Sequence, residues 1–439
     1  MSKRLVSGLA VALVGSLALA ACSGGGAAAP PAAATVGDPA SVSGDITVLT
    51  NRTDLAQDGT FVKYAAAFNK IYPKVKVTVQ GITDYEGEVK TRMNTKDYGD
   101  VLLIPAAIQK SDYPNFFSPL GTQADLSQKY QWTTFTTVGD NVYGIAQNGN
   151  ANGFVYNKKV WADAGITSPA TTPDGFLADL KAIKAKGAAI PYYTNYHDGW
   201  PVGSWQGALG SVTCDSKAND ALATNKAPWT SGTDLYTIDS LLFNVVKEKL
   251  IEPDPTTTNW EASKAQLGTG KVGTMWLASW AVSQMRDAAT KAGGKASDIG
   301  LMPFPTQVDG KFCSVTGPDL NQAINKNSTH QEAAKAWIDW FTDKSGYAET
   351  QGSIPTLKSG TAPNTLADYT KLGVKYIELT QDKAALVNKI DNAGEVGLTK
   401  PDFRQKIVDV ARGAAPGDVN SIFADLNKKW ATGISTAGY

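Results

Sequence analysis

The segment from Asp45 to Pro105 constrains the fold of this chain more than any other feature. It predicts a strand over 45–50, a helix over 59–72 with one apolar stripe, and a second strand over 75–79 in which valine alternates with polar residues. A helix over 86–94 follows, and then a continuous apolar run over 100–105 that is typical of a parallel strand covered on both faces. This β-α-β-α-β order predicts a doubly wound α/β unit, which binds ligands beyond the carboxyl ends of its strands.

A second α/β unit is predicted after residue 140. Short strands over 142–146 and 153–156 flank a polar segment, residues 147–152, which we interpret as a bend. Thr172 and Pro173 predict the start of a helix that Gly187 ends, and further elements follow along the chain. These are a helix around 238–246, strands over 271–276 and 299–302, and a mainly helical region after about 363. The chain is long enough for two lobes rather than one core.

The first 22 residues have the features of an export signal. Lys3 and Arg4 precede an uncharged apolar stretch, residues 5–19, which is short for a membrane span. Leu19-Ala20-Ala21-Cys22 resembles the bacterial lipobox, which implies a signal peptide over 1–21 and a lipid on the Cys22 sulfur. A plain signal peptide with an incidental cysteine is the alternative. Residues 22–44 are mostly Ala, Gly, Ser and Pro, so we expect a flexible tether between the lipid and a globular body outside the cytoplasm.

Charge and cysteine content limit the partners of the chain. Its 41 basic and 41 acidic residues become 39 and 41 once Lys3 and Arg4 are removed, and no basic stripe is visible. Nucleic acid and anionic lipid surfaces are therefore not expected as partners. Besides Cys22, only Cys214 and Cys313 remain, and one disulfide between them is the simple inference for an exported protein. Two cysteines and two histidines so placed do not predict a metal site, and no cofactor is expected.

A series of short segments carries a shared pattern along nearly the whole mature chain. They are Phe68–Val77, Tyr98–Leu102, Tyr143–Gln147, Gly153–Lys158, Gly270–Met275 with Ser279-Trp280, Ile299–Pro305, Asn325–Ser328 and Gly352–Pro355. In this order they resemble the extracellular solute-binding proteins of bacterial sugar ABC transporters, the class that includes maltose-binding protein. One position departs from the pattern, because Gly99 stands where the family often has proline.

The resemblance implies an α/β fold of two lobes, joined by hinge strands near 146–150 and 312–317, with a ligand cleft between them. The expected N-terminal lobe is 45–146 plus 318–345, and the expected C-terminal lobe is 149–314 plus 346–439. The implied partners are a small carbohydrate and the transmembrane permease subunits of the transporter. The implied location is the outer face of the cell membrane, or the periplasm, and we expect a monomer.

A sugar ring has apolar C–H faces and a rim of hydroxyls, so its site combines flat aromatic faces with fixed hydrogen-bonding groups. The resemblance places several loops toward the cleft. The candidate residues on them are Asn51, Arg52, Asp54, Asp84, Asn148, Asn150, Asp198, Trp200, Trp205, Trp276, Trp280 and Asp319. Other roles stay open: a helix cap beside a solvated Arg52, a cap at Asp84, turn chemistry for the asparagines, and a core position for Trp200.

The predicted function is the extracytoplasmic solute-binding component of an ABC importer, which binds a mono- or oligosaccharide and is not an enzyme. A secreted glycoside hydrolase is one alternative, since it also has tryptophan-lined subsites, but no segment carries a recognisable carboxylate pair. His197-Asp198 resembles half of a catalytic triad, and no Gly-x-Ser-x-Gly segment accompanies it. A lipoprotein that binds peptides or other solutes with the same fold is the other alternative, and the tryptophan-rich loops favour sugars.

Overall fold

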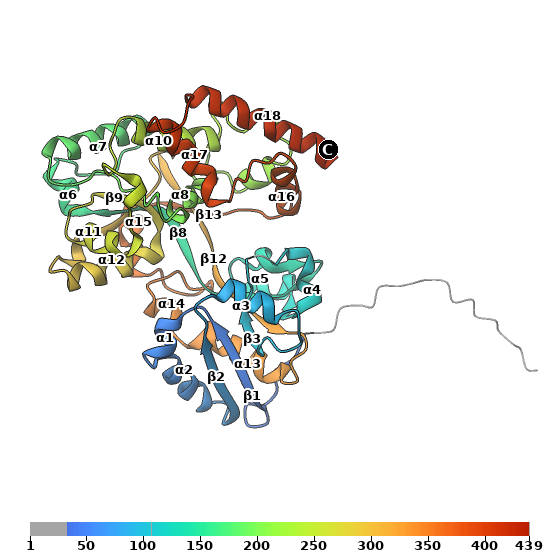
Figure 1. Ribbon diagram of the computed structural model, residues 1–439. Helices are drawn as coiled ribbons and strands as arrows, with labels where there is room; N and C mark the ends of the chain where they lie inside the picture. The colour runs from blue at the N-terminus through green and yellow to red at the C-terminus, as the bar shows by residue number, and fades with distance from the viewer. Residues whose placement is uncertain (1–32, 107, 439) are drawn as a thin grey trace, which may run out of the picture. The chain divides into compact units, whose positions relative to one another are not determined.

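The computed structural model describes residues 33–106 and 108–438, and two β-sheets organise this part of the chain (Figure 1). The larger sheet has ten strands, and its main path is β10-β8-β12-β3-β1-β2. Its strands are β1 (Ser43–Thr50), β2 (Lys74–Gly81), β3 (Val101–Leu103), β4 (Phe117–Ser118), β8 (Ile145–Asn157), β9 (Thr274–Ala278), β10 (Ile299–Met302), β11 (Gln307–Val308), β12 (Lys311–Asn325) and β13 (Lys375–Glu378). The smaller sheet has the order β5-β7-β6 and consists of β5 (Gly121–Thr122), β6 (Thr137–Val138) and β7 (Asn141–Val142).

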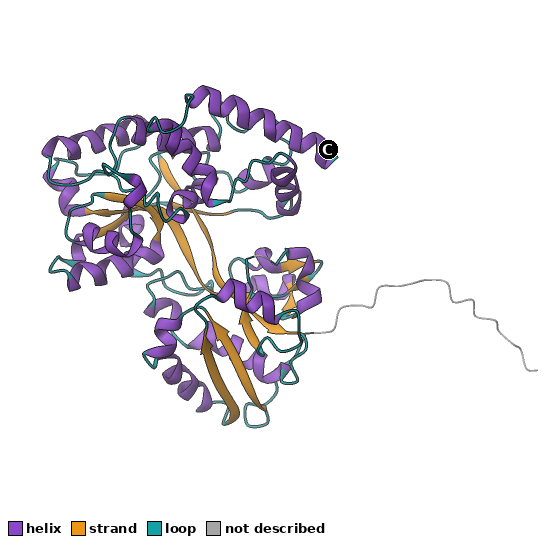
Figure 2. Ribbon diagram, in the orientation of Figure 1, coloured by secondary structure: helices purple, strands orange, loops and turns teal. Residues whose placement is uncertain are grey.

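The predicted β-α-β-α-β unit is confirmed. Strand β1 pairs in parallel with β2 and with β3, and helices stand beside these strands in Figure 2. Phe61 and Phe68 of α2 pack with Trp337 and Phe341 of α13 in a first core cluster. The helices of this region are α1 (Thr53–Gln57), α2 (Thr60–Asn69), α3 (Tyr85–Arg92), α4 (Tyr113–Phe116), α5 (Gln123–Lys129), α13 (Gln331–Lys344) and α14 (Tyr347–Thr350).

A second group of helices surrounds the far ends of the long strands. Phe154 on β8 packs against Trp205, Trp276 and Phe304 in a second core cluster. The helices here are α6 (Lys158–Asp163), α7 (Pro173–Lys186), α8 (Trp200–Gly203), α9 (Ala218–Ala221), α10 (Asp234–Lys247), α11 (Trp260–Gly268), α12 (Ser279–Lys291), α15 (Ala367–Leu372), α16 (Ala384–Ala393), α17 (Pro401–Ala411) and α18 (Val419–Ala437).

Helix α7 begins and ends as its sequence predicts. The Thr172 side chain accepts a hydrogen bond from the Gly175 N–H, which satisfies one of the free donors of the first turn. Gly187 ends the helix with φ of 68°, a left-handed conformation in which glycine carries no Cβ penalty. Local sequence alone therefore sets both boundaries of this element.

The prediction of a polar bend over 147–152 is wrong. Strand β8 runs without interruption from Ile145 to Asn157, and its first half pairs antiparallel with β12 from Ala151↔Thr316 to Ile145↔Gln322. Its second half pairs with β9 and β10. Partner strands supply the backbone hydrogen bonds of this segment, so pairing overrides the turn preference of its Asn and Gly residues. Strands β8 and β12 lie side by side where they pair (Figure 1).

Strand β12 changes partners along its length. It pairs with β13 from Cys313 to Thr316 and with β3 from Gln322 to Ile324. Between these segments, Leu320 has φ of 55°, a left-handed conformation that is uncommon for a residue with a branched side chain. The backbone irregularity thus lies next to Asp319, one of the candidate site residues.

The disulfide inferred from the cysteine count is present between Cys214 and Cys313, whose Cα atoms are 5.5 Å apart. The signal segment 1–21 and Cys22 lie outside the described residues. Within residues 33–106 and 108–438, no helix combines the length and the apolarity needed to cross a membrane.

Candidate ligand-binding site

Arg52 organises a polar network just past the carboxyl end of β1. Its Nε and Nη2 donate to the two carboxylate oxygens of Asp54 at 2.9 and 2.7 Å. Its Nη1 donates to Tyr347 Oη at 3.2 Å and to Gln351 Oε1 at 2.8 Å. The hydrogen bond from Arg52 lowers the pKa of Asp54, and burial raises the pKa of Tyr347 to about 12. Arg52 stands at the N-cap position of α1, as the alternative predicted, but its guanidinium is held by three side chains and is only partly exposed.

A second network lies where β8 and β12 pair. Asn150 Nδ2 donates to Asp319 Oδ2 at 3.1 Å, and Asn150 Oδ1 accepts from Ser279 Oγ at 3.2 Å. Ser279 Oγ in turn accepts from the Ala151 N–H at 3.1 Å. Burial raises the pKa of Asp319, and the hydrogen bond from Asn150 opposes part of that rise. The network holds a carboxylate and an amide in fixed positions, as recognition of neighbouring hydroxyls requires.

Three tryptophans form an aromatic platform, which we define as Trp200, Trp260 and Trp280. The Trp200 and Trp260 rings meet edge to face with centroids 4.8 Å apart. Trp280 lies 5.9 Å from Trp200 and 5.8 Å from Trp260. Trp200 is 38% exposed, so the platform offers apolar ring surface to solvent. This exposure is compatible with Trp200 as a ligand candidate and not with the core position that was its alternative.

The first turns of α12 connect these groups. Ser279 begins the helix and bonds to Asn150, Trp280 follows it in the platform, and Ser283 Oγ donates to the Gln351 carbonyl at 3.3 Å. The Gln351 side chain also accepts a hydrogen bond from Arg52, so the start of α12 connects both polar networks with the platform. The structure thereby brings together Arg52, Asp54, Asn150, Trp200, Trp280 and Asp319 from the predicted set.

Two of the predicted tryptophans have a different environment. Trp205 is 0% exposed and Trp276 is 1% exposed, both within the second core cluster. The Trp205 Nε1–H donates to Tyr192 Oη at 2.8 Å, and the Trp276 Nε1–H donates to the Ser204 carbonyl at 2.9 Å. A ring without exposed surface offers no face to a ligand in this conformation, so we leave both residues out of the site proposed below.

The remaining predicted residues lie at the margins of this arrangement. Asp84 is the N-cap of α3 and accepts from the Gly87 N–H at 3.3 Å, as the cap alternative predicted. Asn51 is exposed beside Arg52. Asn148 is 4% exposed, and its Oδ1 is buried without a hydrogen-bond partner among the described residues. Asp198 Oδ2 is likewise a buried atom without a partner there. Both atoms are free acceptors close in sequence to Asn150 and Trp200.

Sequence reasoning missed four residues of the site, namely Tyr347, Gln351, Ser279 and Trp260. Ser279 precedes Trp280, and Gln351 precedes the Gly352–Pro355 motif, so both stood beside recognised segments. Trp260 follows Asn259, which caps α11 by accepting from the Ala262 N–H at 2.8 Å. The position of Trp260 directly after this capping residue was the sequence feature that could have indicated a ring at the surface.

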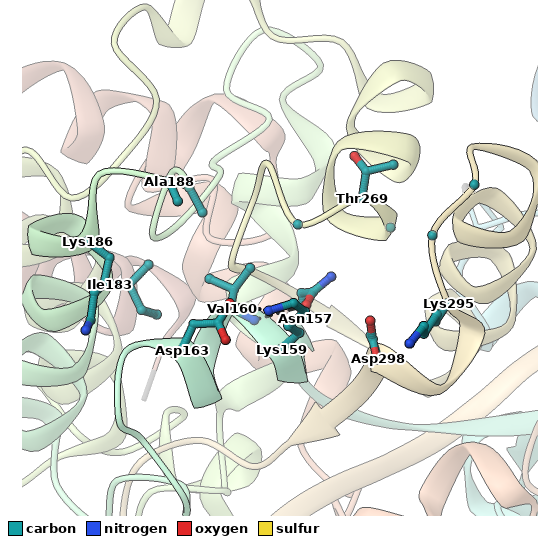
Figure 3. Close-up of a pocket in the computed structure, with 15 residues that line it drawn as sticks. Asn157, Lys159, Val160, Asp163, Ile183, Lys186, Ala188, Thr269, Lys295 and Asp298 are labelled. Atoms are coloured by element: carbon teal, nitrogen blue, oxygen red, sulfur yellow. Dashed lines mark hydrogen bonds and ion pairs between the residues drawn. The ribbon is translucent and has the colours of Figure 1, made fainter.

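The cavity drawn in Figure 3 is a separate feature of the second group of helices. It has a volume of about 430 Å³ and is lined by α6, the end of α7 and the turns around Gly270 and Gly294. Lysines and aspartates mix around it, among them Lys159, Asp163 and Lys186. Its fifteen lining residues include no aromatic side chain, so it lacks the flat surface that a sugar ring requires. Within the described part of the chain, no group of three or more metal-ligating side chains is placed to hold a metal ion.

A family model described as "Bacterial extracellular solute-binding protein" matches residues 52–348. The chain belongs to this family. Its curated relatives include the multiple sugar-binding protein of Streptococcus mutans, 24% identical over 69% of this chain and 73% of that protein. The diacetylchitobiose-binding protein of Streptomyces coelicolor is 30% identical over 49% of this chain and 50% of that protein.

Solved structures of solute-binding proteins are similar over most of the chain. A manno-oligosaccharide-specific solute-binding protein of Bifidobacterium animalis subsp. lactis, in complex with mannotriose, has a TM-score of 0.81 and 31% identity and covers 90% of this chain and 95% of its own. A second binding protein of an ABC transporter from that organism, in complex with mannobiose, has a TM-score of 0.81 and 33% identity over the same shares. The apo form of RafE from Streptococcus pneumoniae, 20% identical with a TM-score of 0.69 over 90% and 99% of the two chains, shares the fold. The predicted two-lobed α/β fold is confirmed.

Proposed function

We propose that this solute-binding protein is the extracytoplasmic component of an ABC importer and binds a manno-oligosaccharide. The observation that carries the proposal is the aromatic platform beside two fixed polar networks. The platform suits the apolar face of a sugar ring, while Arg52, Asn150 and Asp319 suit its hydroxyls. The manno-oligosaccharide class is supported by the two Bifidobacterium proteins, which are 31% and 33% identical to this chain and each cover 90% of it.

The proposed ligand residues are Asn51, Arg52, Asp54, Asn148, Asn150, Asp198, Trp200, Trp260, Trp280 and Asp319, with Ser279, Tyr347 and Gln351 supporting them. Asp84 has its capping role instead. The proposed lobes are 45–146 plus 318–345 and 149–314 plus 346–439, with one change. Helix α14 joins the first lobe, because Tyr347 packs within the first core cluster.

The mechanism follows from two lobes that contact one ligand. A sugar that touches both lobes only in a closed form shifts the population toward that form. The closed form is then recognised by the permease subunits of the transporter, and the sugar is passed on chemically unchanged. The protein acts as a monomer in this proposal and has no catalytic role.

The proposed location is the outer face of the cell membrane. A signal peptide over 1–21, a lipid on Cys22 and a tether to residue 44 would keep the binding lobes near the permease. The test is Cys22→Ser in the native cell. We expect the wild-type protein in the membrane fraction and the variant in the medium or periplasm, whereas equal membrane retention would refute the anchor.

Thermal melting of residues 45–439 tests the ligand class. The panel contains mannobiose, mannotriose, raffinose, chitobiose and a tripeptide. A ligand at about a thousand times its dissociation constant stabilises the native state by roughly 4 kcal/mol, so mannotriose should raise the melting temperature by several degrees. Mannotriose recovered intact after long incubation supports a binding protein, and cleaved sugar supports the hydrolase instead. A shift with the tripeptide alone would overturn the carbohydrate proposal.

A further inference from the structure

A buried carboxyl group lies in the segment that leads to Trp260 of the aromatic platform. Glu252 is 4% exposed and lies in the segment between α10 and α11. Its Oε2 accepts from the Thr194 N–H at 2.9 Å, and its Oε1 accepts from the Thr194 hydroxyl. Thr194 is 2% exposed, so water reaches neither residue and each satisfies the hydrogen-bonding groups of the other.

These bonds join two of the three segments that carry the platform, namely those of Trp200 and Trp260, while Trp280 stands on α12. One segment runs from Tyr192 to Trp200, and the other runs from Leu250 to Trp260. The Tyr192 N–H donates to the Leu250 carbonyl at 3.0 Å, and the His197 N–H donates to Thr258 Oγ1 at 2.8 Å. In the sequence, Glu252 lies between Leu250 and Thr258, and it is the carboxyl group among these contacts.

Short-range hydrogen bonds link the residues between Thr194 and Trp200. Thr194 Oγ1 accepts from the Tyr196 N–H at 3.0 Å, and the Tyr196 carbonyl accepts from the Gly199 N–H at 3.0 Å. The Trp200 N–H then donates to the Asp198 carbonyl at 2.8 Å. A series of short-range hydrogen bonds therefore connects Thr194 to the backbone of Trp200.

We infer that Glu252 is a positioning residue for ligand binding: its carboxylate holds the Trp200 segment against the Trp260 segment, and its protonation loosens the platform. This inference rests on the proposed sugar site and concerns its regulation by pH. In the charged form, the two oxygens accept two charge-assisted hydrogen bonds. In the neutral form, Thr194 Oγ1 accepts from both Glu252 and Tyr196, and the hydroxyl hydrogen of Thr194 loses its partner.

The transition falls in a physiological range. Burial raises the pKa of Glu252 to about 7, and the hydrogen bonds from Thr194 oppose that rise. The other ionisable groups that interact with this carboxyl are Tyr192, Tyr193 and Asp254. Burial raises the pKa of both tyrosines, and the Thr256 side chain lowers the pKa of Asp254, so these three keep their charge state near neutral pH.

Neighbouring groups on the Trp200 segment are charged as well. Asp198 lies beside Trp200, and Tyr196 Oη donates to Asp409, which pairs with Arg412. His197 is an exposed histidine on the same segment. An experiment on Glu252 must therefore separate its effect from that of His197.

The test is calorimetric titration of mannotriose at about pH 5.5 and about pH 8, on the full mature chain. A charge-assisted hydrogen bond exceeds a neutral one by about 1 kcal/mol, so the wild-type protein should bind about fivefold more weakly at the lower pH. Glu252→Gln is neutral at both pH values and should bind with the weaker affinity at both. A Glu252→Gln variant that keeps the wild-type pH dependence would overturn the inference.

Two controls sharpen this experiment. His197→Gln removes the histidine of the segment and should keep the pH dependence of affinity. Loss of the pH dependence in this variant would assign the effect to His197 and overturn the inference. Asp391→Asn is the matched control, because Asp391 is also a buried carboxyl with a raised pKa that accepts a loop N–H, from Leu398 at 2.9 Å. Asp391 lies in α16, away from the platform, so Asp391→Asn should keep the wild-type pH dependence of affinity.

A readout without ligand distinguishes this inference from the proposed function. If mannotriose does not bind at either pH, the ligand class fails, and Glu252 is then judged by fluorine NMR of protein labelled with 5-fluorotryptophan. Trp200→Phe and Trp260→Phe assign the two resonances. Both should shift with a midpoint near pH 7 in His197→Gln and stay constant in His197→Gln/Glu252→Gln. Resonances that stay constant in both proteins would refute the positioning role.

Discussion

Two pairs of tryptophans that look alike in the sequence have opposite surroundings in the structure. Trp200 and Trp205 stand near Gly, Pro and Ser, and Trp276 and Trp280 stand near Gly and Ser. In each pair, one ring belongs to the aromatic platform and the other is fully buried in the second core cluster. Nearby glycines and prolines thus locate a loop or a strand end, while the face on which a side chain emerges depends on the tertiary packing.

The contacts of these rings also indicate different roles for the buried and the platform tryptophans. Trp205 and Trp276 contact Phe154 and each other, so they stabilise the region from which the platform projects. Trp200 and Trp280 contact each other and Trp260. We therefore expect variants of the buried rings to change stability and variants of the platform rings to change affinity.

Trp276→Ala should give the largest effect. Truncation of a buried tryptophan leaves a cavity and costs about 3–5 kcal/mol of unfolding free energy. Urea denaturation measures this loss, and calorimetry below the transition should find the mannotriose affinity of the remaining folded protein nearly unchanged. A stable Trp276→Ala protein with weakened affinity would reverse the assignment of this ring to the core.

Trp280→Ala should reduce affinity instead. A ring that stacks on the ligand in the centre of a site is worth about 2 kcal/mol, or roughly a thirtyfold increase in the dissociation constant for mannotriose. The melting temperature without ligand should change much less than in Trp276→Ala, which is the control. Loss of stability without loss of affinity would place Trp280 with the core rings.

Tyr192→Phe tests the polar contact inside the core. It removes the acceptor of the Trp205 Nε1–H and leaves that donor buried without a partner, at a cost of about 1–2 kcal/mol. Affinity for mannotriose should stay at the wild-type value, because Tyr192 is 2% exposed. An unchanged denaturation midpoint would mean that the Trp205 N–H finds another partner.

Asp319→Asn should give the smallest change in stability, and its sign depends on pH. Because burial raises the pKa of Asp319 above its unfolded value, the folded protein binds the proton more tightly than the unfolded chain does. The associated stability is present below the unfolded pKa and is lost as pH rises through the folded pKa. Asp319→Asn should therefore melt higher than the wild-type protein at about pH 8, but not at about pH 4, and it should bind sugar more weakly at both.

Much of the fold could be predicted from local signals. The alternation of Val75, Val77 and Val79, the Thr172 cap and the Gly187 stop act over a few residues, and the corresponding elements form where expected. The residues after β1 and the Ser279-Trp280 pair were candidates for the site because of their place beside strand ends and recognised motifs. Tyr347 and Gln351 were missed, because their role comes from contact with Arg52, about 300 residues away in sequence.

The sequence by itself determined the β-α order, the boundaries of α7 and the cysteine pair, since these depend on side-chain periodicity, capping and composition. Only the tertiary structure decided that residues 147–152 form a strand, because β12 supplies its hydrogen bonds from more than 160 residues away. It also decided which tryptophans are buried. Burial depends on what packs against each face of an element, and distant segments such as Phe304 and Trp260 provide that surface.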